Sequence, residues 1–140
     1  MSIQINYKGI ILQSAKAIII AIGINIVIFY LATALNFINP DFSMQSNGNK
    51  LTVWNVMSST LLFSFPGVLI FILLVRLTQR PEKTFIWVCI IGFIIFLPAP
   101  FVAFEGIPLS MALSLEIMHV APAYLLWKYL TSTNFKTKIK

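Results

Sequence analysis

Glu116 and His119 stand three positions apart in the middle of an apolar stretch, Leu109–Leu130. At that spacing both side chains lie on one face of a helix. A carboxylate and an imidazole so placed could handle a proton, bind a polar ligand or contribute to a metal pair. An ionisable group inside a bilayer costs about 2.5–3.5 kcal/mol on insertion scales. We therefore expect both groups to face the interior of a helical bundle.

The metal alternative has the least support. Carboxylate-bridged di-metal bundles need two Glu-x-x-His motifs and further glutamates, so a single histidine would require a second copy of the chain. The single cysteine, Cys89, excludes an intrachain disulfide and a thiolate cage. We predict no metal site, no cofactor and no catalytic residue.

Polar residues in two other apolar segments could join this pair. Asn25 falls near the middle of the first segment, and Asn55 and Ser59 fall in the second. Asn55, Ser59, Leu62 and Pro66 share one helical stripe, which we expect to face inward. The predicted interior cluster comprises five residues: Asn25, Asn55, Ser59, Glu116 and His119.

Two interpretations of this cluster remain open. In the structural one, Glu116 hydrogen-bonds to Asn55 or Ser59, and Asn25 makes an interhelical hydrogen bond. In the functional one, the cluster binds a substrate or handles protons. Pro122 bears on both, because its ring presses on the carbonyl of Met118, and a carbonyl loosened in this way could form a small polar pocket.

The elements that must position these residues are membrane spans. Of the 140 residues, 59% are hydrophobic and only 10% are charged, and the mean hydropathy is +0.90. Long apolar runs without alternation favour helices over a membrane barrel. The third segment holds Gly92, which could allow a close helix approach, and Pro98 and Pro100, which should distort its far end. We predict a single domain, 1–140, with spans at about 10–37, 51–75, 84–104 and 109–130.

The loops and charges predict the topology. The turn at residues 105–108 is too short for anything but antiparallel neighbours, so we expect an all-α, up-down-up-down four-helix bundle. Four spans put nine basic residues on one side and only Lys50 on the other, and Lys and Arg mark the cytoplasmic side. We expect a multi-pass protein of a bacterial cytoplasmic (inner) membrane with both termini in the cytoplasm. The nine are Lys8, Lys16, Arg76, Arg80, Lys83, Lys128, Lys136, Lys138 and Lys140.

The net charge of +6 does not indicate nucleic-acid binding. The basic residues flank apolar segments and do not form a patch with interleaved polar and aromatic residues. They are better explained as topology signals and lipid-headgroup contacts. The lipid bilayer is therefore the predicted partner, with a homodimer or a partner membrane protein possible.

Short motifs carry a resemblance to a known family. They are Arg80-Pro81 with Thr84-Phe85, Leu97-Pro98, and LSMALSLEIMHVA with Met118-His119-Val120 at its centre. In these the chain resembles an uncharacterised bacterial family of small four-helix integral membrane proteins, classed as a domain of unknown function. The resemblance implies a four-span fold and places His119 in the family pattern. It implies no known activity, and Glu116 has no place in the pattern.

Three functional hypotheses follow. The favoured one is a non-enzymatic binding or accessory module built around the polar cluster. The alternative is a proton-coupled carrier of a small molecule that works as a homodimer through Glu116 and His119. A membrane enzyme with His119 as acid and base has the least support, because no nucleophile, second base or metal set accompanies it.

Overall fold

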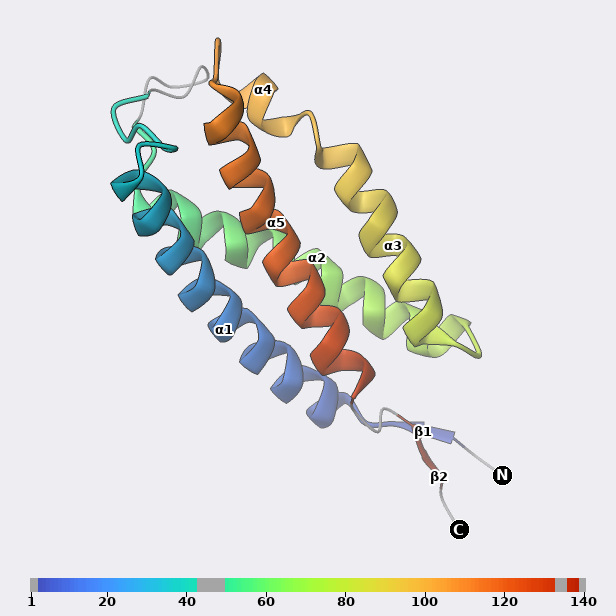
Figure 1. The fold of residues 1–140 in the computed structure, drawn as a ribbon. Coiled ribbons are helices and arrows are strands. Elements are labelled where there is room, and N and C mark those ends of the chain that lie inside the picture. Colours follow the sequence, from blue (N-terminus) through green and yellow to red (C-terminus); the bar gives the residue numbers. More distant parts are fainter. Residues whose placement is uncertain (1–2, 43–49, 133–135, 139–140) are drawn as a thin grey trace.

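Five helices organise the chain in the computed structural model, which describes residues 3–42, 50–132 and 136–138 (Figure 1). For the first, second and fourth expected spans, the helix bounds lie within three residues of the expected ones. The third expected span is divided between two helices. The helices are α1 (Tyr7–Ala34), α2 (Val53–Leu77), α3 (Pro81–Phe96), α4 (Ala99–Ala103) and α5 (Leu109–Thr131).

Local signals fix where the helices start. The Asn6 side chain caps α1 by accepting a hydrogen bond from the backbone N–H of Gly9 at 2.9 Å. Thr52 and Asn55 cap α2 reciprocally, each side chain accepting from the other residue's backbone N–H. Pro81 opens α3, where the missing N–H of proline costs nothing.

Prolines divide the third span. α3 ends at Phe96, and α4 begins at Ala99 between Pro98 and Pro100. Neither proline can donate to the preceding turn, so the helix cannot run through them. The distortion predicted at this end is confirmed. The short α4 then leads through a turn into α5.

The helices run up, down, up and down, and form a four-helix bundle as predicted (Figure 1). α1 packs most extensively against α5 and α2, while α3 contacts α2 and α5. The first and last described elements lie at the same end of the bundle. There β1 (Ile3–Ile5) and β2 (Lys136–Lys138) pair antiparallel, with Ile3 opposite Lys138. This short ladder was not predicted from the sequence.

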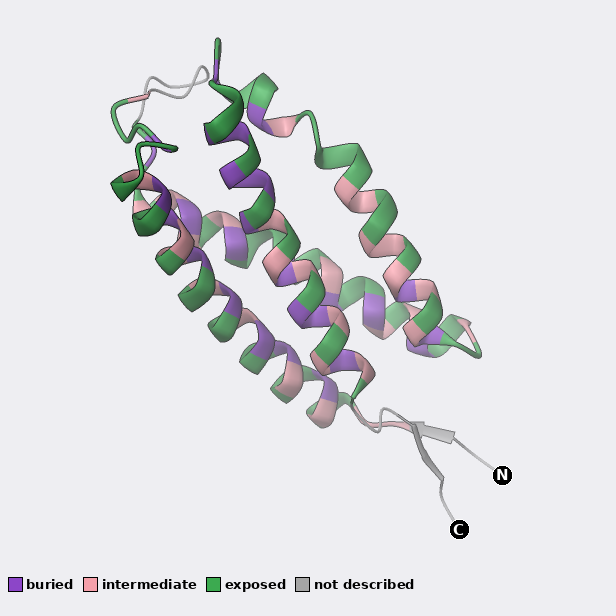
Figure 2. Ribbon diagram, viewed as in Figure 1, coloured by how far each residue is buried: buried purple, intermediate pink, exposed green. Residues whose placement is uncertain are grey.

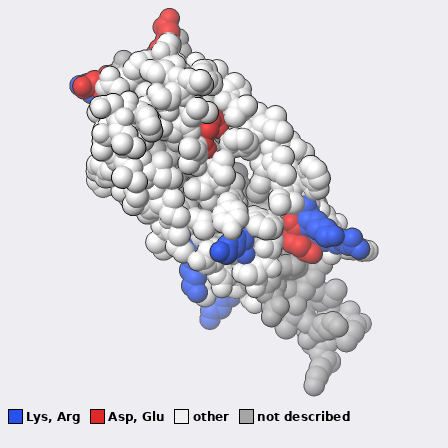
Figure 3. Space-filling model, in the orientation of Figure 1, with Lys and Arg blue, Asp and Glu red and all other residues white. Residues whose placement is uncertain are grey.

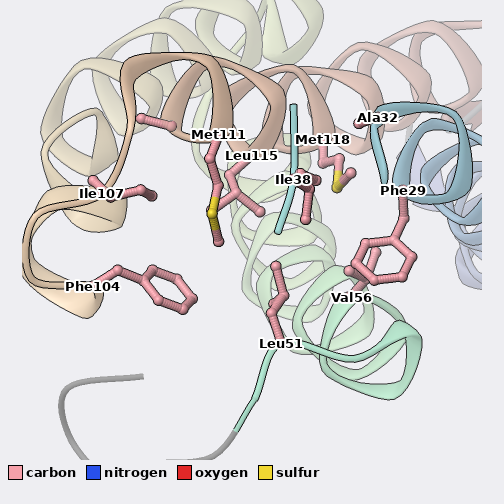
Figure 4. Packing of buried hydrophobic residues seen from close by; sticks show 11 residues of the cluster. Phe29, Ala32, Ile38, Leu51, Val56, Phe104, Ile107, Met111, Leu115 and Met118 are labelled. Carbon is pink, nitrogen blue, oxygen red and sulfur yellow. The ribbon is translucent and has the colours of Figure 1, made fainter. Parts of the chain in front are cut away.

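Two apolar clusters make up the core, and they follow the buried faces of the helices (Figure 2). One lies at the end away from the termini, where Ile38, Phe104 and Ile107 of the connecting segments meet α1, α2 and α5 (Figure 4). The other lies toward the termini and includes the edge-to-face pair Phe71 and Phe85, whose ring centroids are 5.1 Å apart. Connecting segments thus close one end of the bundle.

The outside of the bundle is apolar. Many large apolar side chains are exposed on all four long segments. Charged side chains gather at the two ends, and the flank between them is white except for acidic surface at one place (Figure 3). These are the features of a multi-pass membrane protein. Within the described residues, the helices long and apolar enough to span a membrane are Tyr7–Ala34, Val53–Leu77, Pro81–Ala103 and Leu109–Thr131.

Candidate binding cavity

A cavity of about 590 Å³ lies between α2, α3 and α5. Sites for small molecules usually have volumes of about 300–1,000 Å³ and walls that are mainly apolar with a few polar groups. This cavity fits that description. Its polar lining residues are Asn25, Asn55, Ser59, Thr60, Ser64, Cys89 and His119.

The cavity is open at its rim. Three of its lining residues, Leu62, Phe63 and Phe96, are 69%, 46% and 49% exposed. α3 forms a loose wall, because its buried residues are Pro81 and Phe85 at one end of the helix. These exposed side chains belong to the apolar outer surface, so the cavity communicates with the lipid region.

Asn25 is the most deeply buried polar side chain of the lining, at 1% exposure. Its Nδ2 donates to Thr60 Oγ1 at 2.9 Å and to the backbone oxygen of Met118 at 2.8 Å. Pro122 has no N–H, so the Met118 carbonyl lacks the donor that a regular helix would supply. Asn25 replaces that donor and ties α1, α2 and α5 together. This is the interhelical bond that the structural interpretation predicted.

One polar atom of the Asn25 side chain makes no hydrogen bond within the described ranges. Its Oδ1 is buried and has no hydrogen-bond partner among the described residues. An unsatisfied buried acceptor costs about 1–3 kcal/mol, so such atoms are uncommon in folded proteins. Asn25 lines the cavity, but Oδ1 itself is buried, so the unpaired oxygen is not part of the accessible cavity wall.

His119 also lines the cavity, and one of its nitrogens is fixed. Nδ1 lies 2.8 Å from the backbone oxygen of Leu115. A carbonyl only accepts, so Nδ1 carries the proton, and in the neutral ring Nε2 is then an acceptor. The ring packs edge-to-face on Phe63 at 5.7 Å, and Phe63 packs in the same way on Phe96 at 5.5 Å. These aromatic contacts link α5, α2 and α3 around the cavity.

The stripe predicted on α2 does not lie in the packed core. Asn55 and Ser59 are half-buried, while Leu62 and Pro66 are exposed along the cavity. The buried stripe of α2 lies one to two positions further along the chain than the predicted one, on the face that contacts α1 and α5. It comprises Val56, Thr60, Ser64, Val68, Phe71 and Val75.

Glu116 does not make the contacts that we expected. It is 8% exposed and lies outside the cavity lining, and its Oε1 is buried without a partner among the described residues. The predicted bond to Asn55 or Ser59 is wrong, because Asn55 accepts from Thr52 and Ser59 donates to the backbone oxygen of Val56. The structure therefore brings four of the five predicted residues to the cavity and leaves Glu116 beside it.

Thr60 was not predicted from the sequence as a site residue, and the expectation for Gly92 was wrong. Thr60 lies four positions after Val56 on the buried stripe, and its hydroxyl donates to the Val56 oxygen at 2.7 Å while it accepts from Asn25. That periodicity is the signal that could have identified it. Gly92 does not support a close helix approach: a Cβ there would meet nothing within 4 Å. It lines the cavity instead.

No metal centre is evident in this part of the chain. Across residues 3–42, 50–132 and 136–138, His, Cys, Asp and Glu side chains do not gather in threes or more as metal ligands would. The polar groups of the cavity are amides, hydroxyls, an imidazole and a thiol. Such a set suits hydrogen bonding to a small organic molecule.

Comparison with known families supports the resemblance seen in the sequence. Residues 7–135 match a family described as "Family of unknown function (DUF6069)". The chain belongs to this family. No curated protein and no solved structure gave a match. The DUF6069 region covers every described helix, including those that line the cavity.

Proposed function

We propose that this protein is a non-enzymatic membrane protein that binds a small lipid-soluble molecule in the cavity between α2, α3 and α5. The observation that carries the proposal is the cavity itself, about 590 Å³ in volume, in which His119 Nε2 is left as a hydrogen-bond acceptor. A ligand that donates a hydrogen bond to this nitrogen would complement it. The volume and apolar walls of the cavity support a ligand with a largely apolar body.

The hydrogen bonds support binding rather than catalysis. Nucleophilic catalysis needs a hydroxyl or thiol within hydrogen-bond reach of a base. The hydroxyls of Ser59, Thr60 and Ser64 instead donate to backbone oxygens of their own helix. The proton-coupled carrier has less support, because Glu116 does not line the cavity that contains His119.

We also propose that both termini lie in the cytoplasm, and that the membrane is a bacterial cytoplasmic membrane. Of the nine basic residues that the four-span topology puts on one side, all but Lys140 belong to the described segments toward the β1–β2 end of the bundle. At the opposite end, Lys50 is paired with Asp41 at 2.6 Å. The hydrogen bond from Lys50, together with its charge, lowers the pKa of Asp41 from its ordinary value. The proposed orientation rests on the excess of Lys and Arg at one end over the single Lys50 at the other.

The experiment is photolabelling of the protein in lipid nanodiscs with 3-azioctanol, an eight-carbon alcohol that carries a diazirine. Mass spectrometry then locates the labelled residues. We expect labelling of cavity residues such as Phe63, Cys89 and Phe96. The variant Gly92→Phe should lower this labelling about tenfold, because the phenyl group occupies open space in the cavity.

Gly23→Phe is the matched control. A Cβ at Gly23 also meets nothing within 4 Å, but Gly23 lies on the exposed face of α1, outside the cavity. Labelling of the cavity should therefore be unchanged in Gly23→Phe. Labelling spread evenly over the lipid-facing helices, or equal loss in both variants, would refute the proposed binding site.

A further inference from the structure

We infer that the polar end of the cavity's ligand is a hydrogen-bond donor, so that the ligand is a lipophilic alcohol or amine rather than an ether, ketone or ester. This inference rests on the proposed function. It follows from a count of which protons around the cavity are already used. A binding site selects a ligand whose donors and acceptors complement those that the protein leaves unpaired.

The hydroxyls on α2 have no proton to offer. Ser59 donates to Val56 oxygen at 3.0 Å, Thr60 donates to the same oxygen at 2.7 Å, and Ser64 donates to Thr60 oxygen at 2.6 Å. A hydroxyl has one proton and two lone pairs, so each of these groups retains accepting capacity only. The polar wall that α2 gives to the cavity is therefore a wall of acceptors.

The amide of Asn25 and the neutral ring of His119 also have no proton left to donate, because their N–H groups are already hydrogen-bonded. The two N–H groups of the Asn25 amide match its two hydrogen bonds, to Thr60 Oγ1 and Met118 oxygen, and its Oδ1 remains unpaired. The proton of neutral His119 is used on the Leu115 oxygen, which leaves Nε2 as an acceptor. α5 thus adds the Nε2 acceptor of His119 to the acceptors of α2, while Oδ1 of Asn25 on α1 is itself buried.

Two lining groups differ, because each can donate a hydrogen bond. The amide nitrogen of Asn55 is a donor, but Asn55 is in the first turn of α2, eight residues and about 12 Å along the helix axis before Phe63, on which His119 packs. The thiol of Cys89 is a weak donor on α3. Beside His119, an ether or ketone would meet the Nε2 acceptor without a proton to give it. An alcohol or amine would donate to it.

The test compares two isomers as competitors of 3-azioctanol labelling in nanodiscs. 1-Octanol has a hydroxyl donor, whereas heptyl methyl ether has the same formula and no donor. At equal mole fraction in the lipid, we expect octanol to displace cavity labelling about tenfold more effectively. Equal displacement by the two isomers would overturn the inference while leaving the proposed binding site intact. Absence of cavity labelling by 3-azioctanol would instead contradict the proposed function.

Two variants locate the preference. His119→Phe keeps the ring against Phe63 but removes Nε2, so the advantage of octanol over the ether should fall. Gly23→Phe should keep the full advantage. An unchanged advantage in His119→Phe would overturn the role given to that imidazole. An advantage that persists on the same residues in Gly92→Phe would show that the preference arises outside the cavity, and would overturn the inference.

Discussion

The carbonyl of Met118 is the point at which three helices are joined. Pro122 leaves this oxygen without its helical donor, and the Asn25 amide supplies one at 2.8 Å while also holding Thr60. Pro122 thus frees a carbonyl in α5, and Asn25 of α1 binds that carbonyl specifically. Proline in membrane helices is tolerated where neighbouring side chains satisfy the freed backbone in this way.

A double-mutant cycle tests this account. Asn25→Ala should lower the free energy of unfolding by about 1–3 kcal/mol, because it leaves the Met118 oxygen buried and unpaired. In the background of Pro122→Ala the loss should be smaller by about 1 kcal/mol, since the N–H of the new alanine can donate to that oxygen. Unfolding by sodium dodecyl sulfate in mixed micelles gives the four free energies. Equal losses in the two backgrounds would contradict the coupling.

At the residue scale the sequence predicted some contacts and misplaced others. The freed Met118 carbonyl and the hydrogen bond of Asn25 followed from proline geometry and from the cost of a buried amide. The expected bond from Glu116 to Asn55 or Ser59 did not form. Serine and asparagine near a helix start find partners within their own helix, and the sequence does not say whether a local or a distant partner wins.

α3 is held to the bundle mainly at its first turns. Phe85 is buried against Phe71, whereas Trp87, Ile91 and Ile94 further along are more than half exposed. The remaining length of α3 forms one wall of the cavity, and Phe96 at its end packs edge-to-face on Phe63 of α2. A helix anchored at one end gives the cavity a wall that can shift to suit an occupant.

The anchor can be tested through the native Cys89, which is half-buried four residues after Phe85. Phe85→Ala should speed the reaction of Cys89 with N-ethylmaleimide in micelles by about tenfold or more, because truncating a buried phenylalanine costs about 3–5 kcal/mol and loosens the helix. Trp87→Ala is the control, since Trp87 is 63% exposed on the same helix. Similar rates in the two variants would show that Phe85 does not anchor α3.

At the element scale, apolar run length and proline positions were sufficient to predict four spans and the break near Pro98. The sequence could not predict the looseness of α3. Its residues are apolar on every side, so no stripe indicates which face packs and how closely. The cavity depends on that spacing, and for this reason neither the cavity nor the exposure of Gly92 to it was foreseen.

For the whole molecule, the distribution of charge predicts orientation. Two single-cysteine variants in a Cys89→Ala background test it in intact bacterial cells with a membrane-impermeant maleimide. Glu105→Cys lies in the turn between α4 and α5, and Gln79→Cys lies in the connection between α2 and α3. We expect the first to be labelled in intact cells and the second only after lysis, because Arg76, Arg80 and Lys83 flank the second position. The reverse pattern would invert the proposed topology.

The short ladder between β1 and β2 has a consequence for how self-association should be measured. Because Ile3–Ile5 and Lys136–Lys138 are paired residue by residue, halves of a split fluorescent reporter fused to the two termini would meet within a single molecule. Tethered fragments experience an effective concentration in the millimolar range. Fluorescence from such a fusion would then report one copy folding, so a homodimer has to be sought with both halves carried at the same terminus of separate copies.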